Sequence, residues 1–310
     1  MLLCALLLPV AAAAAPQPGY EVVGQVAPEV QASVALHGAT TPFATSTLSD
    51  SSGKFRFTRL AAGQYTLSVF SPGYGEKRIT IDVGPASTDS KGRFRVTVSL
   101  DASAQSVTLG GTVSVSELSI PVRARKECAE ADKHLEKRDI DGAIEHLLKA
   151  VELAPGYTSA WNHLGTIAYQ TRRYADAERY FRKGLETNRD SYEPLVNLGG
   201  VLLTLGKKEE AFQYNLFATQ KRPRDALANA QLGMNYLALG KVDPAEKYLL
   251  EACRLDPGHF SHPQLLLAEI YVRKNDPAKA AGQLEDFLRY HPGWQNAEQL
   301  KVVIRKLRNR

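Results

Sequence analysis

The chain has 310 residues, of which 44% are hydrophobic, so it can bury sizeable cores and more readily forms two domains than one. Its 38 Lys and Arg residues against 33 Asp and Glu residues give a net charge of +5, with the excess in the C-terminal part. A surplus this small over so many residues argues against a nucleic-acid-binding protein.

The chain begins with an apolar run, MLLCALLLPVAAAAAPQP, that ends in small residues. This pattern is typical of a secretory signal peptide, although no Lys or Arg follows Met1, and the run is too short to span a bilayer comfortably. We expect residues 1–15 to be removed, the mature chain to have no transmembrane segment, and the protein to be secreted or periplasmic. Of the remaining cysteines, Cys128 and Cys253 lie too far apart in the repeats for a structural disulfide.

Residues 20–100 alternate hydrophobic and polar positions with a period of two, as in KFRFTRL and QYTLSVF, between turn sequences such as SDSSGK and SPGYG. Short strands separated by such turns predict a β-sandwich. Phe55 and Phe57 should face one way, after a tight turn in which Asp50 bonds its own backbone. The run DSSGKFRFTRLAAGQYTLSVFSPGY resembles the carboxypeptidase regulatory-like family, a small prealbumin-type sandwich that is often found near the N-terminus of secreted bacterial proteins.

The resemblance implies a fold that is also classed as carbohydrate-binding-like, but a fold alone does not place a sugar site. Tyr20, Tyr65 and Tyr74 could stack on a sugar, whereas aromatic residues on sandwich strands are more often core. Carbohydrate or cell-wall binding through the sandwich is therefore the alternative function. Residues 101–120 lose the turn signals and are rich in Ser, Thr, Val and Gly, which predicts an edge strand and a linker.

After Pro121 the hydrophobic period becomes that of helices, and an internal repeat appears. The intervals between Pro155, Pro223, Pro257 and Pro292 are 68, 34 and 35 residues. One unit contains Trp161, Leu164, Gly165, Ala177 and Phe181, and this pattern of large and small residues resembles the tetratricopeptide repeat. We expect five units within residues 121–295, at about 124–157, 158–191, 192–225, 226–260 and 261–294, and a capping helix at 296–310.

The small residues of this repeat predict packing and not catalysis. Gly165 and Ala177 allow two antiparallel helices to approach closely, while Leu164 and Phe181 fill the space between units. The predicted fold class is therefore multidomain β + α, with an N-terminal β-sandwich followed by an α-helical superhelix.

The resemblance implies that the first helix of each unit lines a concave groove that holds a peptide or protein. A groove with an apolar middle and charged ends suits an extended peptide or a partner's helix. The apolar strip in its middle is expected not to contribute to the contacts between repeats. In an alternative, the groove is partly filled by the protein's own segments, such as the linker. The predicted groove residues are Asn162, Thr166, Tyr169, Val196, Leu203, Leu227, Met234, Leu237, Leu265 and Arg273.

The sequence contains no Gly-rich phosphate loop with a following Lys, no His-Glu-x-x-His, no Cys-x-x-Cys and no Gly-x-Ser-x-Gly. His259 and His262 are the best metal candidates, but two histidines in a loop are more often solvated. Cys128 has no nearby His to act as its base. We therefore expect no catalytic residue, metal or cofactor, and interpret the chain as a non-enzymatic scaffold. A third possibility is an accessory subunit of an envelope enzyme.

Overall fold

The computed structural model describes residues 19–101 and 119–309, so the predicted signal segment and nearly all of the predicted linker lie outside the described residues. The described part consists of an N-terminal β-sandwich followed by an α-helical superhelix, as the sequence predicts. The strands, in chain order, are β1 (Tyr20–Ala27), β2 (Ser33–Gly38), β3 (Ala44–Leu48), β4 (Lys54–Leu60), β5 (Gly63–Ser71), β6 (Gly75–Val83) and β7 (Arg93–Ser99).

The strands form two sheets with the hydrophobic core between them. One sheet has the order β4-β1-β7, in which β1 and β7 run parallel, and the other has the antiparallel order β3-β2-β5-β6. Phe55 and Phe57 are each 5% exposed, which confirms that they face the same way. The preceding turn is held by Asp50 Oδ1, which accepts hydrogen bonds from the backbone N–H groups of Ser52 and Lys54 at 2.9 Å each.

The solenoid consists of paired helices followed by a last single helix. Each pair has a first and a second helix. The helices are α2 (Val122–Glu136), α3 (Ile140–Leu153), α4 (Thr158–Gln170), α5 (Tyr174–Thr187), α6 (Tyr192–Thr204), α7 (Lys208–Lys221), α8 (Ala226–Ala238), α9 (Val242–Leu255), α10 (Pro263–Arg273), α11 (Pro277–Tyr290) and α12 (Ala297–Arg308).

Small residues in the first helices allow close contact with the second helices. A Cβ atom at Gly165 would overlap the ring of Phe181, and one at Gly233 would lie 2.7 Å from Cγ of Leu249. The contacting residue lies 16 positions after the glycine in both units. This regular contact explains why the motif specifies packing.

The turn between the two helices of each unit contains one residue with a left-handed backbone. The φ angles at these positions are 61°, 61°, 76°, 72° and 56°. Glycine adopts this conformation without strain, whereas other L-residues pay about 1–2 kcal/mol. Two units therefore use glycine and three do not; the residues are Arg138, Arg172, Gly206, Gly240 and Asn275.

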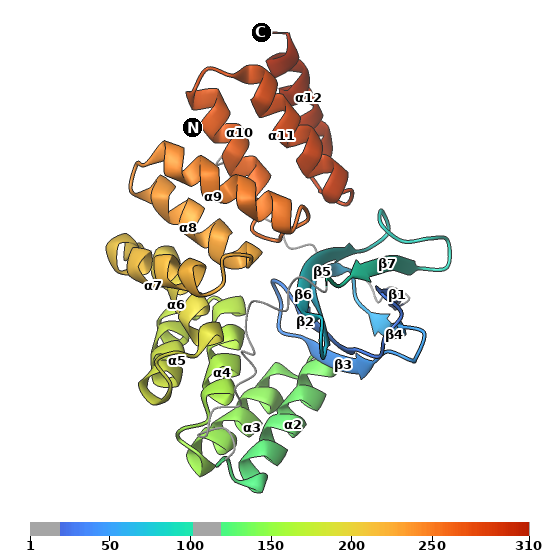
Figure 1. Cartoon of the computed structure of the whole chain (residues 1–310), viewed down its shortest axis with the longest axis vertical. Coiled ribbons are helices and arrows are strands. Elements are labelled where there is room, and N and C mark those ends of the chain that lie inside the picture. The colour runs from blue at the N-terminus through green and yellow to red at the C-terminus, as the bar shows by residue number, and fades with distance from the viewer. Residues whose placement is uncertain (1–18, 102–118, 310) are drawn as a thin grey trace.

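The helix pairs form an arc, and the sandwich lies on its inner side, between α2–α4 at one end and α10–α12 at the other (Figure 1). The second helices α5 and α7 lie on the outer side of the arc (Figure 1). Among the described helices, none is both long and apolar enough to cross a membrane.

Candidate functional site: the concave face of the solenoid

Polar residues of the predicted groove connect the first helices of neighbouring units. Asn197 Nδ2 donates to Asn162 Oδ1 at 2.9 Å, which joins α6 to α4. The hydroxyl groups of Tyr169 and Thr204 lie 3.3 Å apart and make a second link between the same helices. Thr166 donates back to the carbonyl of Asn162 at 2.9 Å. These side chains therefore align two repeats as well as lining the inner face of the solenoid.

Most of the apolar groove residues pack against the solenoid's own core. Val196 and Leu265 are only 3% and 9% exposed. Leu203, Leu227 and Leu237 are partly buried against core clusters that join neighbouring helices. The expectation that the apolar strip makes no contribution to contacts between repeats is thus wrong for these leucines, because their side chains cover core residues of the solenoid itself.

The remaining predicted residues keep part of their surface accessible. Tyr169 is 39% exposed, and Met234 and Thr166 are partly buried. Arg273 is exposed and pairs with Glu269 one turn earlier on the same helix. Tyr169 and Arg273 are thus the exposed members of the predicted set, whereas Thr166 and Met234 share an intermediate exposure with Asn162, Leu203, Leu227 and Leu237.

The sandwich itself contacts the solenoid through the β3-β2-β5-β6 sheet. At the N-terminal end of the solenoid, Arg138 donates to the hydroxyl of Tyr65 at 3.0 Å, and its guanidinium lies 5.3 Å from the centre of the Phe43 ring. Gln170, at the end of α4, donates to the carbonyl of Gly38 at 2.8 Å. This arrangement resembles the alternative in which the protein's own segments partly fill the groove, but the segment that lies there is the sandwich, whereas the sequence analysis named the linker.

Charged groups make the contact in the middle of the arc. Arg78, on β6, pairs with Glu76 of its own strand at 2.7 Å and approaches Glu193 of α6 to 3.5 Å. Arg222 also pairs with Glu193, at 3.2 Å, so one carboxylate is shared by the two domains. Burial alone would raise the pKa of Glu76, but the Arg78 guanidinium lowers it below its usual range. The charges at this contact are therefore mutually compensated.

Buried polar groups make the contact at the C-terminal end. Asp256 is 4% exposed, and its Oδ2 accepts a hydrogen bond from the backbone N–H of Thr80 at 2.9 Å. Burial raises the pKa of Asp256 to about 6, against the opposing effect of its hydrogen bonds with Thr80. His259 is also only 4% exposed, and His262 is partly buried. The expectation that these two histidines are solvated is therefore wrong, because the connection between α9 and α10 is covered by the sandwich.

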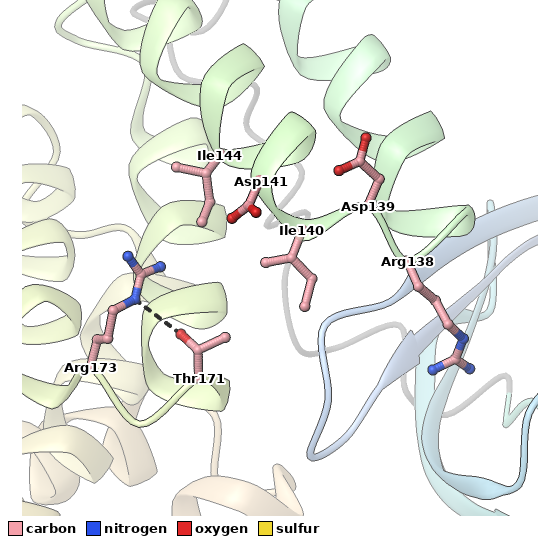
Figure 2. A pocket seen from close by; sticks show the side chains of 7 residues that line it. All are labelled: Arg138, Asp139, Ile140, Asp141, Ile144, Thr171 and Arg173. Carbon is pink, nitrogen blue, oxygen red and sulfur yellow. Dashed lines mark hydrogen bonds between the residues drawn. The ribbon is translucent and has the colours of Figure 1, made fainter. Parts of the chain in front are cut away.

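The described residues also form a pocket of about 470 Å³ where the α2–α3 and α4–α5 turns meet (Figure 2). Its two arginines have partners, because Arg138 reaches the sandwich and Arg173 Nε donates to Thr171 Oγ1 at 3.2 Å. Nowhere in residues 19–101 and 119–309 do three or more His, Cys, Asp or Glu side chains form a group that could hold a metal. The pocket is lined by Arg138, Asp139, Ile140, Asp141, Ile144, Thr171 and Arg173.

The tyrosines considered for sugar stacking belong to the sandwich core. Tyr20 is 7% exposed and Tyr65 is 2% exposed, and Tyr74 packs against the same core. Their ring faces therefore contact protein. Burial also raises the pKa of the Cys128 thiol to about 11 and that of the Cys253 thiol to about 12, so both stay protonated at neutral pH.

Sequence reasoning did not identify the residues of the domain contact. Gln64, Arg78 and Asp256 are each ordinary in their local sequence, and no short motif marks them. The available signal was the outward-facing polar residues of β5 and β6, which a period of two places on one side of the sheet. That pattern fits a solvated face as well as a docked one.

Comparison with known families agrees with the fold. The sequence profile of the carboxypeptidase regulatory-like domain matches residues 22–88, and profiles of the tetratricopeptide repeat match residues 128–192, 166–223 and 226–259. Among solved structures, MamA from Desulfovibrio magneticus RS-1 aligns with 57% of this chain and 99% of its own, with a TM-score of 0.50 and 19% identity. PilW, titled a type IV pilus biogenesis factor, aligns with 60% and 91%, with a TM-score of 0.51 and 18% identity. At these identities the likeness shows the fold alone.

Curated relatives match part of the chain. The type IV pilus assembly protein PilF of Pseudomonas aeruginosa is 26% identical over 174 residues, which are 56% of this chain and 68% of PilF. Anaphase-promoting complex subunit 3 of Schizosaccharomyces pombe is 24% identical over 186 residues, which are 60% of this chain. The chain spans 28% of that subunit's length and about two thirds of PilF. The chain carries an N-terminal carboxypeptidase regulatory-like domain followed by tetratricopeptide repeats.

Proposed function

We propose that the protein is a secreted or periplasmic, non-enzymatic scaffold that binds a protein or peptide on the inner face of its repeats. The stacked repeats support this role, because a solenoid presents an extended surface on a rigid frame. The observation that carries the proposal is the set of exposed and partly exposed side chains on the first helices, which includes Thr166, Tyr169, Met234 and Arg273.

The chemistry of this accessible set suits a polypeptide partner. Tyr169 offers a ring and a hydroxyl, Met234 offers an adaptable apolar side chain, and Arg273 offers a charge near the end of the row. An extended peptide or an amphipathic helix presents apolar and charged groups at comparable intervals.

Two further observations support an assembly role at the cell envelope. PilF is named a type IV pilus assembly protein, and its similarity to this chain extends over 56% of the chain. The apolar N-terminal run has the composition of a secretory signal. We infer a scaffold that assembles proteins outside the cytoplasm, with the sandwich held against its inner face.

The proposal is tested by capture of partners with the full-length protein after crosslinking in the native envelope. The paired changes Tyr169→Glu and Met234→Glu should abolish capture, because they place carboxylates where an apolar ligand would have to desolvate them. Phe217→Glu is the matched control: Phe217 is 41% exposed and belongs to α7, a helix on the outer side of the arc (Figure 1).

The expected result is loss of the partner with the paired change and retention with Phe217→Glu, while far-ultraviolet circular dichroism stays unchanged for both. Tyr74→Ala, in the sandwich, should also retain the partner. If the paired variant keeps its partner and Phe217→Glu loses it, binding occurs on the outer surface and the proposal fails.

A further inference from the structure

One amide group of the sandwich reaches two imidazole rings of the solenoid. Nε2 of Gln64, on β5, lies 3.3 Å from Nε2 of His262 and 3.5 Å from Nδ1 of His291. The amide NH₂ has two hydrogens to donate and cannot accept. Both imidazole nitrogens must therefore carry a lone pair, which requires that each ring is neutral.

The two imidazoles are surrounded by protein. His291 is 1% exposed, and the centroids of the two rings are 4.8 Å apart. The rings of Phe287 and Trp294 each lie within 5.3 Å of the His262 ring, centroid to centroid. A positive charge placed here would be poorly solvated, and two would repel each other at short range.

We propose that Gln64, His262 and His291 form an acid-sensitive clasp, which holds the sandwich against the last repeats while both imidazoles are neutral and releases it when they are protonated. Protonation replaces each acceptor with an N–H donor directed at the Gln64 NH₂ group. Rotation of the amide would turn its oxygen toward the rings, but the repulsion between two imidazolium ions would remain. This clasp does not depend on the identity of any partner.

The direction of the pH effect follows from the environment of the rings. Burial lowers the pKa of His262 to about 4, and burial together with His262 lowers the pKa of His291 to about 3. Because an ordinary histidine titrates near 6.5, acidification below that pH favours the open form, in which the rings are solvated. For each imidazole, the closed form weakens by about tenfold per pH unit until the pH reaches the lowered pKa.

Other charged groups near the clasp modify this response. Asp256 and Asp82 act in the opposite direction as the pH falls, since burial raises the pKa of each carboxyl in the closed form, to about 6 for Asp256. His259 acts in the same direction as the clasp, with a pKa lowered by burial to about 3, and its Nδ1 lies 2.7 Å from Ser261 Oγ within its own loop. Other titratable groups lie near the clasp. Lys77 on β6 and Cys253 on α9 interact electrostatically with Asp256, Asp286 on α11 interacts with Cys253, and Asp82 on β6 lies beside Gly293.

The experiment follows the full-length protein between pH 8 and pH 3. Small-angle X-ray scattering measures the radius of gyration, and far-ultraviolet circular dichroism measures helix content. Fluorescence of Trp294 reports directly on His262, because an imidazolium beside an indole quenches its emission; Trp161→Phe removes the other tryptophan signal. The wild type should show quenching and an increase in the radius of gyration below about pH 5 while its helix content is retained.

The paired variant His262→Gln and His291→Asn keeps an acceptor oxygen at each position but cannot be protonated, so it should remain compact over the same range. His146→Gln, on α3 and paired with Glu127, is the control and should open like the wild type. Gln64→Ala provides a second test, because loss of the amide should move opening to higher pH. The proposal is overturned if the paired variant expands at the same pH as the wild type, or if the wild type stays compact until helix content is lost.

Discussion

The carboxylate of Asp256 accepts a hydrogen bond from the backbone N–H of Thr80 over 2.9 Å and so joins the end of α9 to the outermost strand of the β3-β2-β5-β6 sheet. An edge strand has backbone groups with no partner inside the sheet, and this carboxylate satisfies one of them. The contact thus links the two domains through a buried group.

Replacing Asp256 by Asn should change the pH dependence of stability. The pKa of Asp256 is raised to about 6 in the folded protein. Its contribution to the free energy of unfolding is therefore most favourable below about pH 4 and is lost as the pH rises through 6. Asn keeps an acceptor for Thr80 and carries no charge, so the variant should gain stability over the wild type above pH 6, by about 2–3 kcal/mol at most. Denaturant unfolding at pH 4 and pH 7 measures the difference. Equal gains at both pH values would contradict the buried-carboxylate assignment.

Two glycine-to-alanine changes should have opposite effects on the solenoid. Gly165→Ala places a methyl group against the ring of Phe181 and should destabilise the fold by about 1–3 kcal/mol. Gly282→Ala, on α11, meets no atom within 4 Å and should stabilise the fold by about 0.5–1 kcal/mol, since alanine loses less entropy in a helix. Thermal unfolding followed by circular dichroism compares them. A melting temperature that falls equally for both would show that the repeat register is misassigned.

Equivalent turn positions in two units should respond oppositely to substitution. Arg172 has a φ angle of 61° and Gly206 has a φ angle of 76°. Arg172→Gly should relieve strain and raise stability by about 1 kcal/mol, whereas Gly206→Ala should introduce strain and lower it by about the same amount. Equilibrium unfolding in urea provides both values. If Arg172→Gly lowers stability instead, the contacts of the arginine side chain stabilise the fold by more than its left-handed backbone destabilises it.

Residues 20–118 and 119–310 should fold as separate fragments, because each has its own hydrophobic core. The first should give a β-type circular dichroism spectrum and the second a helical one. Mixed together, they should associate, and Arg138→Ala should weaken the complex by removing the contacts with Tyr65 and Phe43. An unfolded solenoid fragment would show instead that the sandwich is needed to complete its fold.

The fold could be predicted from the sequence because its signals are local. The pairing of Gly165 with Phe181 recurs at the same spacing in a later unit, as Gly233 with Leu249, so the repeat specifies its own packing. The alternation around Phe55 and Phe57 likewise specifies the face that each strand buries. Both patterns reflect contacts that lie close in sequence or within one sheet.

The surface was harder to predict, because it depends on contacts between distant segments. The groove positions implied by the repeat do not distinguish Val196, which packs in the core, from Met234, which is only partly buried. The contacts of Gln64 with His262 and His291 join residues that are 198 and 227 positions apart. No periodicity connects such positions, so the docked sandwich could be found only from the structure.

The measurement that most directly tests the scaffold function is site-specific photocrosslinking in the native envelope, with benzoylphenylalanine placed at Met234 in one sample and at Phe217 in another. These positions lie on a first helix and on a second helix of neighbouring units, so they compare the two faces of the same solenoid. We expect a defined partner protein to be crosslinked from Met234 and not from Phe217. A partner crosslinked from Phe217 and absent from Met234 would contradict the proposal that the inner face binds it.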